Sequence, residues 1–296
     1  MPDNDISIIL PAYKAEAFIE RSARSALEQT VSASEVVVVS DDGVDYVRFL
    51  AGRGLTDRRL RGVATNGIGT GPANARNAGL AAASGRVIAT LDADDVIEPA
   101  YLEVLAPLAH RHGAAYSARR FIDLTSNQEL ESLDRVMPDG PVGLEDILTS
   151  QIHSWAGIVF DRQRVHAQWP SWTELWEDVY FFVRCFDDVD FLYHVSNPLY
   201  HYFRNPSSIC NDPAAGHRHL DSALALLARL ERGETLDLRN PATREIYRRY
   251  LTSRARIESE FIQAQDAGTV TDFHAFIRRH REHFYTLDVA AAENGI

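Results

Sequence analysis

The stretch Val87-Ile-Ala-Thr-Leu-Asp-Ala-Asp-Asp95 decides the fold class. Its first five residues form a short apolar run typical of a buried strand, and three carboxylates follow within four residues. Residues 6–10 and 36–39 are similar apolar runs, and residues 15–29 and 72–83 carry apolar side chains at helical spacing. Strands that alternate with helices in this way predict an α/β fold, with a mainly parallel central sheet flanked by helices.

The second half of the chain has a different pattern. Residues 114–205 mix short strand-like runs with loops, and from about residue 215 the spacing is helical. Asn240-Pro241 is typical of a helix N-cap followed by its first turn. We therefore predict an α/β domain over residues 1–210 and a helical C-terminal extension over residues 211–296. Four leucines of this extension are spaced to share one helix face: Leu220, Leu224, Leu227 and Leu230.

Composition excludes several classes of protein. The 296 residues are 45% hydrophobic and 24% charged, which excludes a disordered chain. A formal net charge of −12 argues against a nucleic-acid binder that neutralises phosphates. The two cysteines are too few for a disulfide framework. The sequence has neither a secretory signal pattern nor eighteen consecutive apolar residues, so we expect a cytoplasmic protein.

The Asp92-Ala93-Asp94 segment is the strongest candidate for a chemical site. Two carboxylates spaced i, i+2 on a turn after a strand can both reach a divalent cation. Their hard oxygens suit Mg²⁺ or Mn²⁺, and these ions commonly also bind substrate phosphates. The alternative is a solvated acidic loop that caps the following helix.

Further polar residues follow the other predicted strand or begin a helix. Asp41 and Asp42 come directly after residues 36–39, where a carboxylate can accept a hydrogen bond from a base or a ribose. The alternative there is an ordinary Asp-Gly turn. Arg76 stands near the start of a predicted helix, and its guanidinium suits a diphosphate. The alternative is a surface arginine.

The aromatic middle of the chain holds the remaining candidates. Glu177 and Asp178 stand among aromatic residues, and partial desolvation suits a general base. An acid pair favoured by a helix N-terminus is the alternative. His201 can complete a metal shell, and Arg204 can pair with a phosphate. The tryptophans between residues 169 and 176 either stack on an acceptor sugar or cover the core.

Taken in order, these segments resemble glycosyltransferase family 2, which has the GT-A fold. The resemblance spans about residues 5–210 and does not cover the helical extension. Lys14 stands where the family usually has Asn, and Val44 where it usually has Ser. The segments that carry it are Pro11-Ala-Tyr-Lys14, Ser25 to Thr30, Val39 to Val44, Ala75-Arg-Asn77, Ala83-Ser-Gly85, Leu91 to Asp95, Glu177-Asp178 and Tyr202 to Ser208.

The resemblance implies a metal-dependent, inverting glycosyltransferase. Residues 1–113 would bind a nucleotide-diphosphate sugar, with UDP favoured, and residues 114–210 the acceptor. The acceptor would be a saccharide or a lipid-linked saccharide with a free hydroxyl, in bacterial surface or exopolysaccharide synthesis.

The resemblance also implies a role for each candidate residue. Asp41 would contact the base, and Asp92 the ribose or a metal-bound water. Asp94 would bind Mn²⁺ or Mg²⁺, with His201 as a further ligand, and Asp178 would be the general base. The other residues expected at the substrates are Pro11, Ala12, Tyr13, Asp42, Arg76, Ala93, Glu177 and Arg204.

Two other functions stay open at this point, a sugar-phosphate nucleotidyltransferase and a noncatalytic scaffold of the same fold. The helical extension offers no recognisable chemistry. We expect it to pack on the catalytic domain or to form a homodimer, with peripheral membrane contact as a weaker option. Its arginines fit a solvated face better than a lipid-binding one, because acidic residues are interspersed among them.

Overall fold

The computed structural model describes residues 5–150, 155–173, 175–205, 215–270, 273–284 and 286–287. The strands are β1 (Ile6–Ala12), β2 (Glu35–Ser40), β3 (Leu60–Ala64), β4 (Val87–Thr90), β5 (Val96–Ile97), β6 (Ala114–Asp123), β7 (Glu129–Leu130), β8 (Gly140–Val142), β9 (Ile158–Asp161) and β10 (Leu192–Arg204). The helices are α1 (Ile19–Leu27), α2 (Tyr46–Gly52), α3 (Pro72–Ala82), α4 (Tyr101–His112), α5 (Leu144–Ser150), α6 (Glu177–Cys185), α7 (Ala215–Glu231), α8 (Pro241–Asp266) and α9 (Phe273–Phe284). The predicted boundary between residues 210 and 211 lies outside the described residues.

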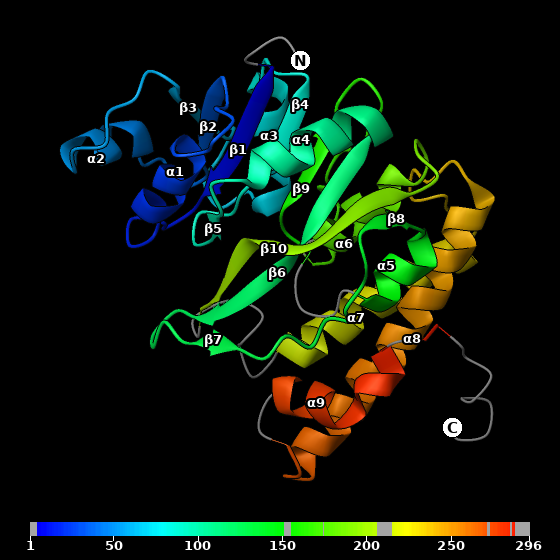
Figure 1. The fold of residues 1–296 in the computed structure, drawn as a ribbon. Helices are drawn as coiled ribbons and strands as arrows, with labels where there is room; N and C mark the ends of the chain where they lie inside the picture. The colour runs from blue at the N-terminus through cyan, green and yellow to red at the C-terminus, as the bar shows by residue number, and fades with distance from the viewer. Residues whose placement is uncertain are drawn as a thin grey trace.

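One mixed sheet forms the centre of the molecule (Figure 1). Its strands lie in the order β3-β2-β1-β4-β9-β6-β10-β5. The first four are mutually parallel, β6 is parallel to β10, and β9 runs antiparallel to both of its neighbours. The predicted α/β fold with a mainly parallel sheet is confirmed.

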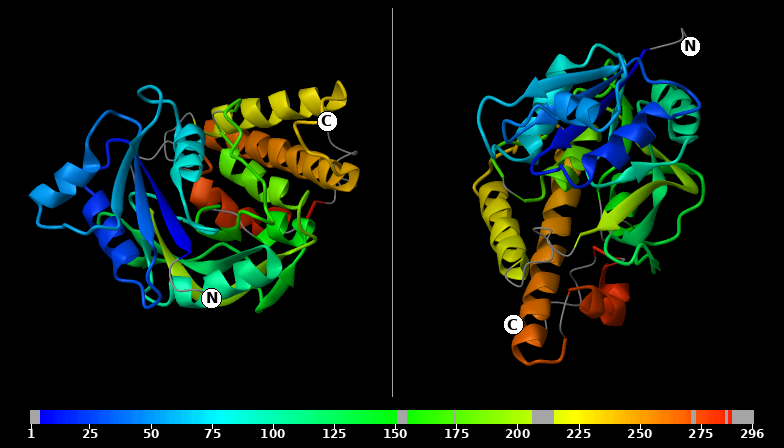
Figure 2. Two further views of the ribbon diagram at one scale, coloured as in Figure 1. Left: turned by 90° about the horizontal axis from the view of Figure 1, so that it is seen from above. Right: turned by 90° about the vertical axis from the view of Figure 1, so that its left-hand side faces the viewer.

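Helices cover both faces of the sheet, because side chains alternate along each strand. Ile8 and Leu10 of β1 point to the side of α1, α2 and α4, whereas Ile9 points to the side of α3, α5 and α6. The extension continues this second layer: α7 and α8 lie against each other and pack beside α5 and α6 (Figures 1 and 2).

Helix α3 lies so close to the sheet that a residue larger than glycine would not fit at position 79. A Cβ added to Gly79 would lie 2.4 Å from Cγ2 of Ile9 and 3.0 Å from Cγ2 of Val39. The alanine-rich composition of this helix has the same physical cause, since small side chains let its backbone lie close to β1 and β2. This contact fixes the start of the helix, which carries Arg76, relative to the strand ends.

The extension is helical as predicted, with one correction. The Asn240 side chain caps α8 by accepting a hydrogen bond from the backbone N–H of Ala242 at 2.9 Å. The predicted leucine face of α7 is wrong at Leu224, which is 48% exposed. Ala223 and Leu226 are buried, and Leu220, Leu227 and Leu230 pack partly buried against the same core, so Leu224 alone of the four leucines departs from the predicted face.

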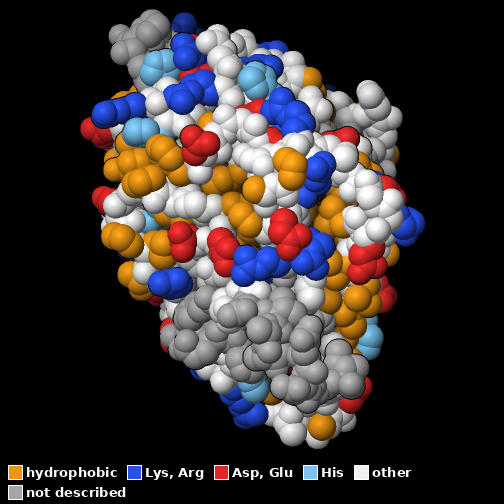
Figure 3. Space-filling model, turned by 90° about the vertical axis from the view of Figure 1, so that its right-hand side faces the viewer, with side chains coloured by type: hydrophobic (Ala, Val, Ile, Leu, Met, Phe, Trp, Pro, Cys, Tyr) orange, Lys and Arg blue, Asp and Glu red, His pale blue; other side chains and the backbone are white. Residues whose placement is uncertain are grey.

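The arginines of the extension are paired with acids. Figure 3 shows acidic and basic side chains interspersed on one face of the molecule. The ion pairs join Arg248 to Glu245, Arg249 to Glu145, Arg254 to Glu258, Arg256 to Glu260 and Arg278 to Glu131. This pairing agrees with the expected solvated face except at Arg254, whose pair with Glu258 is buried. Membrane contact and the homodimer stay predictions.

Among the described residues, every helix is too short or too polar to cross a lipid bilayer.

Candidate active site

Residues 92–95 form a turn directly after β4. Side chains of helix α1 hold this turn by hydrogen bonds to its backbone carbonyls. The Arg21 guanidinium donates to the carbonyl of Asp94 at 2.6 Å. The Ser22 hydroxyl lies within hydrogen-bond distance of the carbonyls of Ala93 and Asp95, at 2.7 and 2.6 Å. These contacts leave the carboxylates of Asp92 and Asp94 unconstrained by α1. Sequence reasoning missed both α1 residues, because no local motif marks them.

Asp95 anchors the turn to β10. Its carboxylate accepts hydrogen bonds from the Tyr200 hydroxyl at 2.7 Å and from the Phe203 backbone N–H at 2.8 Å. The residue is 1% exposed, and burial, followed by the charges of Asp94 and Asp92, raises its pKa well above the usual range. The Tyr200 hydroxyl also accepts from the backbone N–H of Asp92 at 3.3 Å. This network holds the first and last residues of the turn against one strand.

We predict that Asp95→Ala destabilises the fold by about 2–4 kcal/mol, because it leaves the Phe203 N–H and the Tyr200 hydroxyl buried without their acceptor. Urea unfolding at pH 7 measures this free energy. Asp95→Asn is the matched control, since its amide oxygen still accepts one bond, and it should cost less. A loss below about 1 kcal/mol for Asp95→Ala would contradict the anchor.

Arg76 brings together three of the predicted site segments. Its Nη2 lies 2.9 Å from Oδ1 of Asp92, and its Nη1 lies 3.3 Å from Oε1 of Glu177. Burial lowers the pKa of Arg76, but the charges of Asp92 and Glu177 outweigh burial and the net pKa is raised. The residue is only 9% exposed, so the alternative of a surface arginine is wrong. One guanidinium thus links the start of α3, the turn after β4 and the start of α6.

Glu177 and Asp178 form the first turn of α6, and both are largely buried. Burial, and then the charge of Asp178, raises the pKa of Glu177 to about 7. Burial also raises the pKa of Asp178, against the lowering effect of Arg76. Oδ1 of Asp178 accepts a hydrogen bond from the backbone N–H of Val179 at 2.7 Å. The pair therefore supplies carboxyl groups whose pKa values are shifted toward neutrality.

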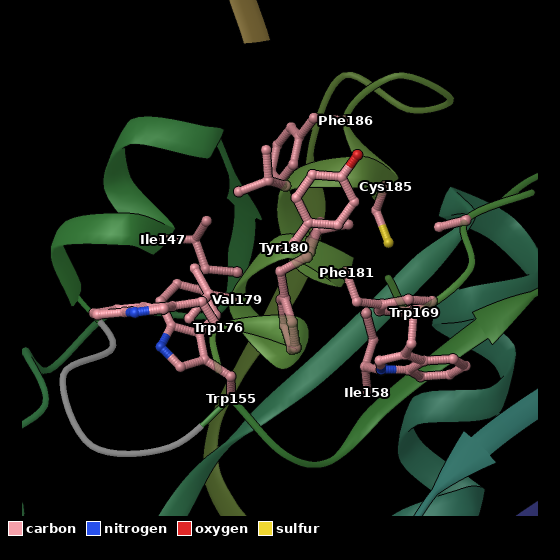
Figure 4. Close-up of a cluster of buried hydrophobic side chains, with 14 of the residues drawn as sticks. Ile147, Trp155, Ile158, Trp169, Trp176, Val179, Tyr180, Phe181, Cys185 and Phe186 are labelled. Carbon is pink, nitrogen blue, oxygen red and sulfur yellow. The ribbon is translucent and has the colours of Figure 1, made fainter. Parts of the chain in front are cut away.

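The tryptophans near α6 belong mainly to the core. Trp169 stacks on Phe181 with ring centroids 3.9 Å apart, and Figure 4 shows this stack at the opposite end of the cluster from Trp155 and Trp176. Trp169 and Trp176 are 4% and 6% exposed, which favours the core alternative for both. Trp172 is 36% exposed, and the Arg229 guanidinium lies 4.4 Å from its ring centroid.

The two acids after β2 are hydrogen-bonded to neighbouring loops, and Asp41 accepts its side-chain bonds from the segment between β3 and α3. Oδ1 of Asp41 accepts bonds from the Thr65 hydroxyl and from the hydroxyl and N–H of Thr70, at 2.6 to 3.0 Å. Its Oδ2 accepts one, from the N–H of Gly71 at 2.9 Å. Burial raises the pKa of Asp41, but these bonds outweigh burial and lower it overall. Asp42 accepts bonds from the Tyr46 hydroxyl, from the N–H of Val44 and from the N–H of Lys14 in the loop after β1.

The Pro11-Ala12-Tyr13 segment lies beside these loops. The Ala12 carbonyl accepts a hydrogen bond from the Asp41 N–H at 2.9 Å, and Tyr13 is 49% exposed. Lys14 has a φ of 50°, in the left-handed region that Asn tolerates better than Lys. This backbone conformation gives a physical reason for the Asn that the family usually has at this position.

Asp94 is the residue best suited to a metal ion. Burial, followed by the charge of Asp92, raises its pKa to about 6, and a bound cation would favour its ionised form. Within the described parts of the chain, no group of three or more His, Cys, Asp or Glu side chains is gathered as a ready-made metal cage. Such a site fits Mg²⁺ or Mn²⁺ held by one or two carboxylates, with the remaining ligands from phosphates and water.

The side chains of His201 and Arg204 contact acidic residues outside the turn that carries Asp92 and Asp94. Nε2 of His201 lies 2.8 Å from Oε1 of Glu98, and Nη2 of Arg204 lies 3.6 Å from Oδ2 of Asp123. His201 follows Tyr200 in β10, and neighbouring strand residues point to opposite faces. The arrangement therefore lends no support to His201 as a metal ligand, which stays a prediction. Ser208 lies outside the described residues.

The mixed sheet with helices on both faces is the GT-A fold that the resemblance implies. The family model described as "Glycosyl transferase family 2" matches residues 7–156, about half of the chain. The chain belongs to this family, and the resemblance noted in its motifs is confirmed. Membership favours a glycosyltransferase over the nucleotidyltransferase.

Curated relatives come from bacterial polysaccharide synthesis. The chain is 44% identical over 96 residues to the UDP-Glc:alpha-D-GlcNAc-diphosphoundecaprenol beta-1,3-glucosyltransferase WfgD of Escherichia coli, which covers 32% of this chain and 37% of that protein. It is 39% identical over 110 residues to the succinoglycan biosynthesis protein ExoO of Rhizobium meliloti, covering 37% of this chain and 31% of that protein. The chain thus matches well under half the length of both relatives.

Solved structures support the fold. S. aureus TarS superposes with a TM-score of 0.61 and 17% identity, over 86% of this chain and 43% of TarS. Residues 1–349 of TarS in complex with UDP-GlcNAc superpose with a TM-score of 0.60 and 16% identity, over 86% of this chain and 72% of that one.

Proposed function

We propose that the chain is an inverting, metal-dependent glycosyltransferase that moves a sugar from a UDP-sugar to a hydroxyl of a saccharide or lipid-linked saccharide, in the synthesis of a bacterial surface or exopolysaccharide. The observation that carries this proposal is the contact of Arg76 with both Asp92 and Glu177, beside Asp178 and at the edge where the parallel strands end. The name of WfgD, which includes a UDP-glucose donor, and the UDP-GlcNAc complex of TarS support the choice of donor.

The proposed reaction is a single displacement. The acceptor oxygen forms a bond to the anomeric carbon as the bond from that carbon to the diphosphate oxygen breaks, so the configuration inverts. Asp178 takes the proton from the acceptor hydroxyl, which requires its carboxylate form. The raised pKa of Asp178 suits this role, since it strengthens the base while leaving it ionised at a pH above that value.

The leaving diphosphate carries the developing negative charge. Arg76 is the buried cation of the site, and its two carboxylate partners fix the direction in which its remaining N–H groups point. Asp94 would hold Mn²⁺ or Mg²⁺, which when bound neutralises charge on the phosphate oxygens. Arg204, at the end of β10, is the second candidate cation.

The nucleoside would lie at the ends of β1 and β2. The half-exposed ring of Tyr13 offers a flat surface beside Asp41. Oδ2 of Asp41 accepts one hydrogen bond in the structure and has a second lone pair for a base N–H. A cytoplasmic enzyme in peripheral contact with the inner face of a membrane would meet a lipid-linked acceptor there, and this location is part of the proposal.

The test is a thermal-shift and turnover experiment with UDP, GDP and dTDP, each with and without Mn²⁺. We expect UDP with Mn²⁺ to raise the Tm most, since a ligand at 100 times its Kd stabilises the native state by about 2.7 kcal/mol. EDTA should abolish the shift. We also expect slow release of UDP from at least one of UDP-glucose, UDP-N-acetylglucosamine and UDP-galactose.

Other outcomes would identify the alternatives. Binding of UDP without hydrolysis or transfer of any UDP-sugar would indicate a noncatalytic scaffold. Release of pyrophosphate from UTP and a sugar 1-phosphate would indicate a nucleotidyltransferase.

A further inference from the structure

Trp176, the residue before α6, has a backbone conformation that needs external support. Its φ and ψ are 69° and 12°, in the left-handed region. A bulky residue in this region is strained and persists only where surrounding contacts hold it. The next two residues along the chain are Glu177 and Asp178. The conformation of Trp176 therefore sets the direction in which α6 begins.

The contacts that hold Trp176 come from α7 and α8. Its indole N–H donates to the backbone carbonyl of His219 at 3.3 Å. Its ring meets those of His219 and Tyr250 edge to face, with centroids 5.2 and 6.0 Å apart. The Arg254 guanidinium lies 5.3 Å from the ring centroid. Figure 4 shows Trp176 beside Trp155, whose ring also packs against Tyr250.

Arg254 is itself fixed in place. It forms a 3.0 Å ion pair with Glu258, and the two side chains are only 9% and 2% exposed. A cation near the face of an aromatic ring is attracted to it, and more strongly when both are shielded from water. The Arg254 guanidinium also lies 5.0 and 5.7 Å from the ring centroids of Phe284 and Phe273, so the pair keeps a buried cation between Trp176 and the rings of α9.

A second contact joins α6 to the same layer. The Tyr180 hydroxyl donates to the carbonyl of Leu236, and the Tyr180 ring packs edge to face on Tyr247 at 5.9 Å. Leu236 and Asp237 also have positive φ, at 50° and 62°. Strained backbone thus lies on both sides of the contact between α6 and the C-terminal helices.

We propose that helices α7 and α8 act through Trp176, which is a positioning residue for the Glu177–Asp178 pair. The inference rests on the proposed function, because it gives the extension a role in the reaction assigned to Asp178. The extension supplies no reacting group and fixes the first turn of α6 instead. A displacement of about 1 Å in a reacting group costs up to a hundredfold in rate, so loss of this support should lower turnover without affecting donor binding.

The first test compares the same substitution at two tryptophans that pack against α6 or begin it. Trp176→Phe removes the indole N–H and shrinks the ring, whereas Trp169→Phe does the same to the tryptophan stacked on Phe181 in the second turn of α6. We expect turnover of the UDP-sugar that the wild type hydrolyses fastest to fall about 10- to 100-fold in Trp176→Phe and less than threefold in Trp169→Phe. The Kd for UDP with Mn²⁺ should stay within twofold in both. Equal losses in the two variants would overturn the proposal.

A double variant separates this proposal from the proposed function. If Trp176 acts through Asp178, then Trp176→Phe should lower turnover less than twofold further in an Asp178→Asn background. Equal losses in both backgrounds would overturn the positioning role. Full activity of Asp178→Asn alone would instead refute the assigned base.

A third variant removes a contact of Trp176 without changing any residue of α6. The double substitution Arg254→Met with Glu258→Gln removes the cation and leaves no unpaired charge behind. We expect turnover to fall about three- to tenfold, and amide hydrogen exchange to become faster at residues 178–180. Unchanged exchange at these amides, together with wild-type turnover, would show that the C-terminal helices do not position the pair. Hydrogen exchange also gives a readout that needs no substrate.

Discussion

Turnover should fall by about 10²–10⁴-fold in Asp178→Asn, the usual contribution of a positioned general base. The substitution keeps the shape of the side chain and removes the proton acceptor. The Kd for UDP with Mn²⁺ should stay near the wild-type value, because a base acts mainly in the transition state. Stopped assays of UDP release, with calorimetry for the binding step, measure the two quantities separately.

The pH profile sharpens this prediction. The base must be deprotonated to accept the proton, and the pKa of Asp178 is raised. Wild-type activity should therefore fall as the pH is lowered through the pKa of Asp178, and this fall should begin at a higher pH than for an ordinary aspartate. Asp178→Asn should lose this dependence along with its activity. Asp221→Asn, an exposed carboxylate on α7, serves as the control and should behave as wild type. Near-normal transfer by Asp178→Asn with intact donor binding would show that the base lies elsewhere.

Glu177 is the rival for the same role. Its carboxylate contacts Arg76, so Glu177→Gln should weaken the hold on that guanidinium while keeping an oxygen that accepts from it. We expect a loss of less than about tenfold, since the proton acceptor stays in place. A loss in Glu177→Gln as large as that in Asp178→Asn would exchange the two assignments.

Binding of UDP in the presence of Mn²⁺ should weaken at least about a hundredfold in Asp94→Asn, or by about 2.8 kcal/mol. Asn keeps one oxygen but loses the charge that attracts a divalent cation. The pKa of Asp94 is about 6, so protons compete with the cation below that pH. Wild-type affinity should therefore fall as the pH drops below 6, and this dependence should be absent in Asp94→Asn. Calorimetric titrations from pH 5 to 8 test both statements.

The free protein is the control for this variant. Because burial and the charge of Asp92 already disfavour the ionised form of Asp94, a neutral side chain should leave the Tm without ligand unchanged or slightly raised. Mn²⁺-dependent affinity equal to that of the wild type would remove Asp94 from the proposed metal site.

The sequence was sufficient to predict the fold and to single out Arg76, Asp92 and Glu177, which the structure brings together. Apolar runs that end in acids place Asp41 and Asp92 after parallel strands, and such strands end at one edge of a sheet. The order of the motifs along the chain indicated the glycosyltransferase family. The contact of Arg76 with Glu177 joins residues 101 positions apart, and no local pattern shows it.

The remaining parts of the site depend on tertiary contacts. In the sequence, Asp95 is one more acid in an acidic run. In the structure it is buried and anchors the turn, because the Tyr200 hydroxyl donates to its carboxylate. Arg21 and Ser22 have no sequence signal, since they bind backbone carbonyls that any residue possesses. The error at Leu224 has a related cause, because spacing gives the period of a helix and leaves its rotation to packing.

Part of the aromatic surface at the start of α6 is covered by residues that the ribosome makes later. Trp176 and Tyr180 are complete when the chain has passed residue 180, but Tyr247 and Tyr250 emerge only after most of α8 has been added. At about 5–20 residues per second, the nascent chain exposes this face for several seconds. During synthesis the α/β domain therefore has an exposed aromatic surface. Chaperone capture should be strongest in this interval, and slow codons between α6 and α8 would prolong it.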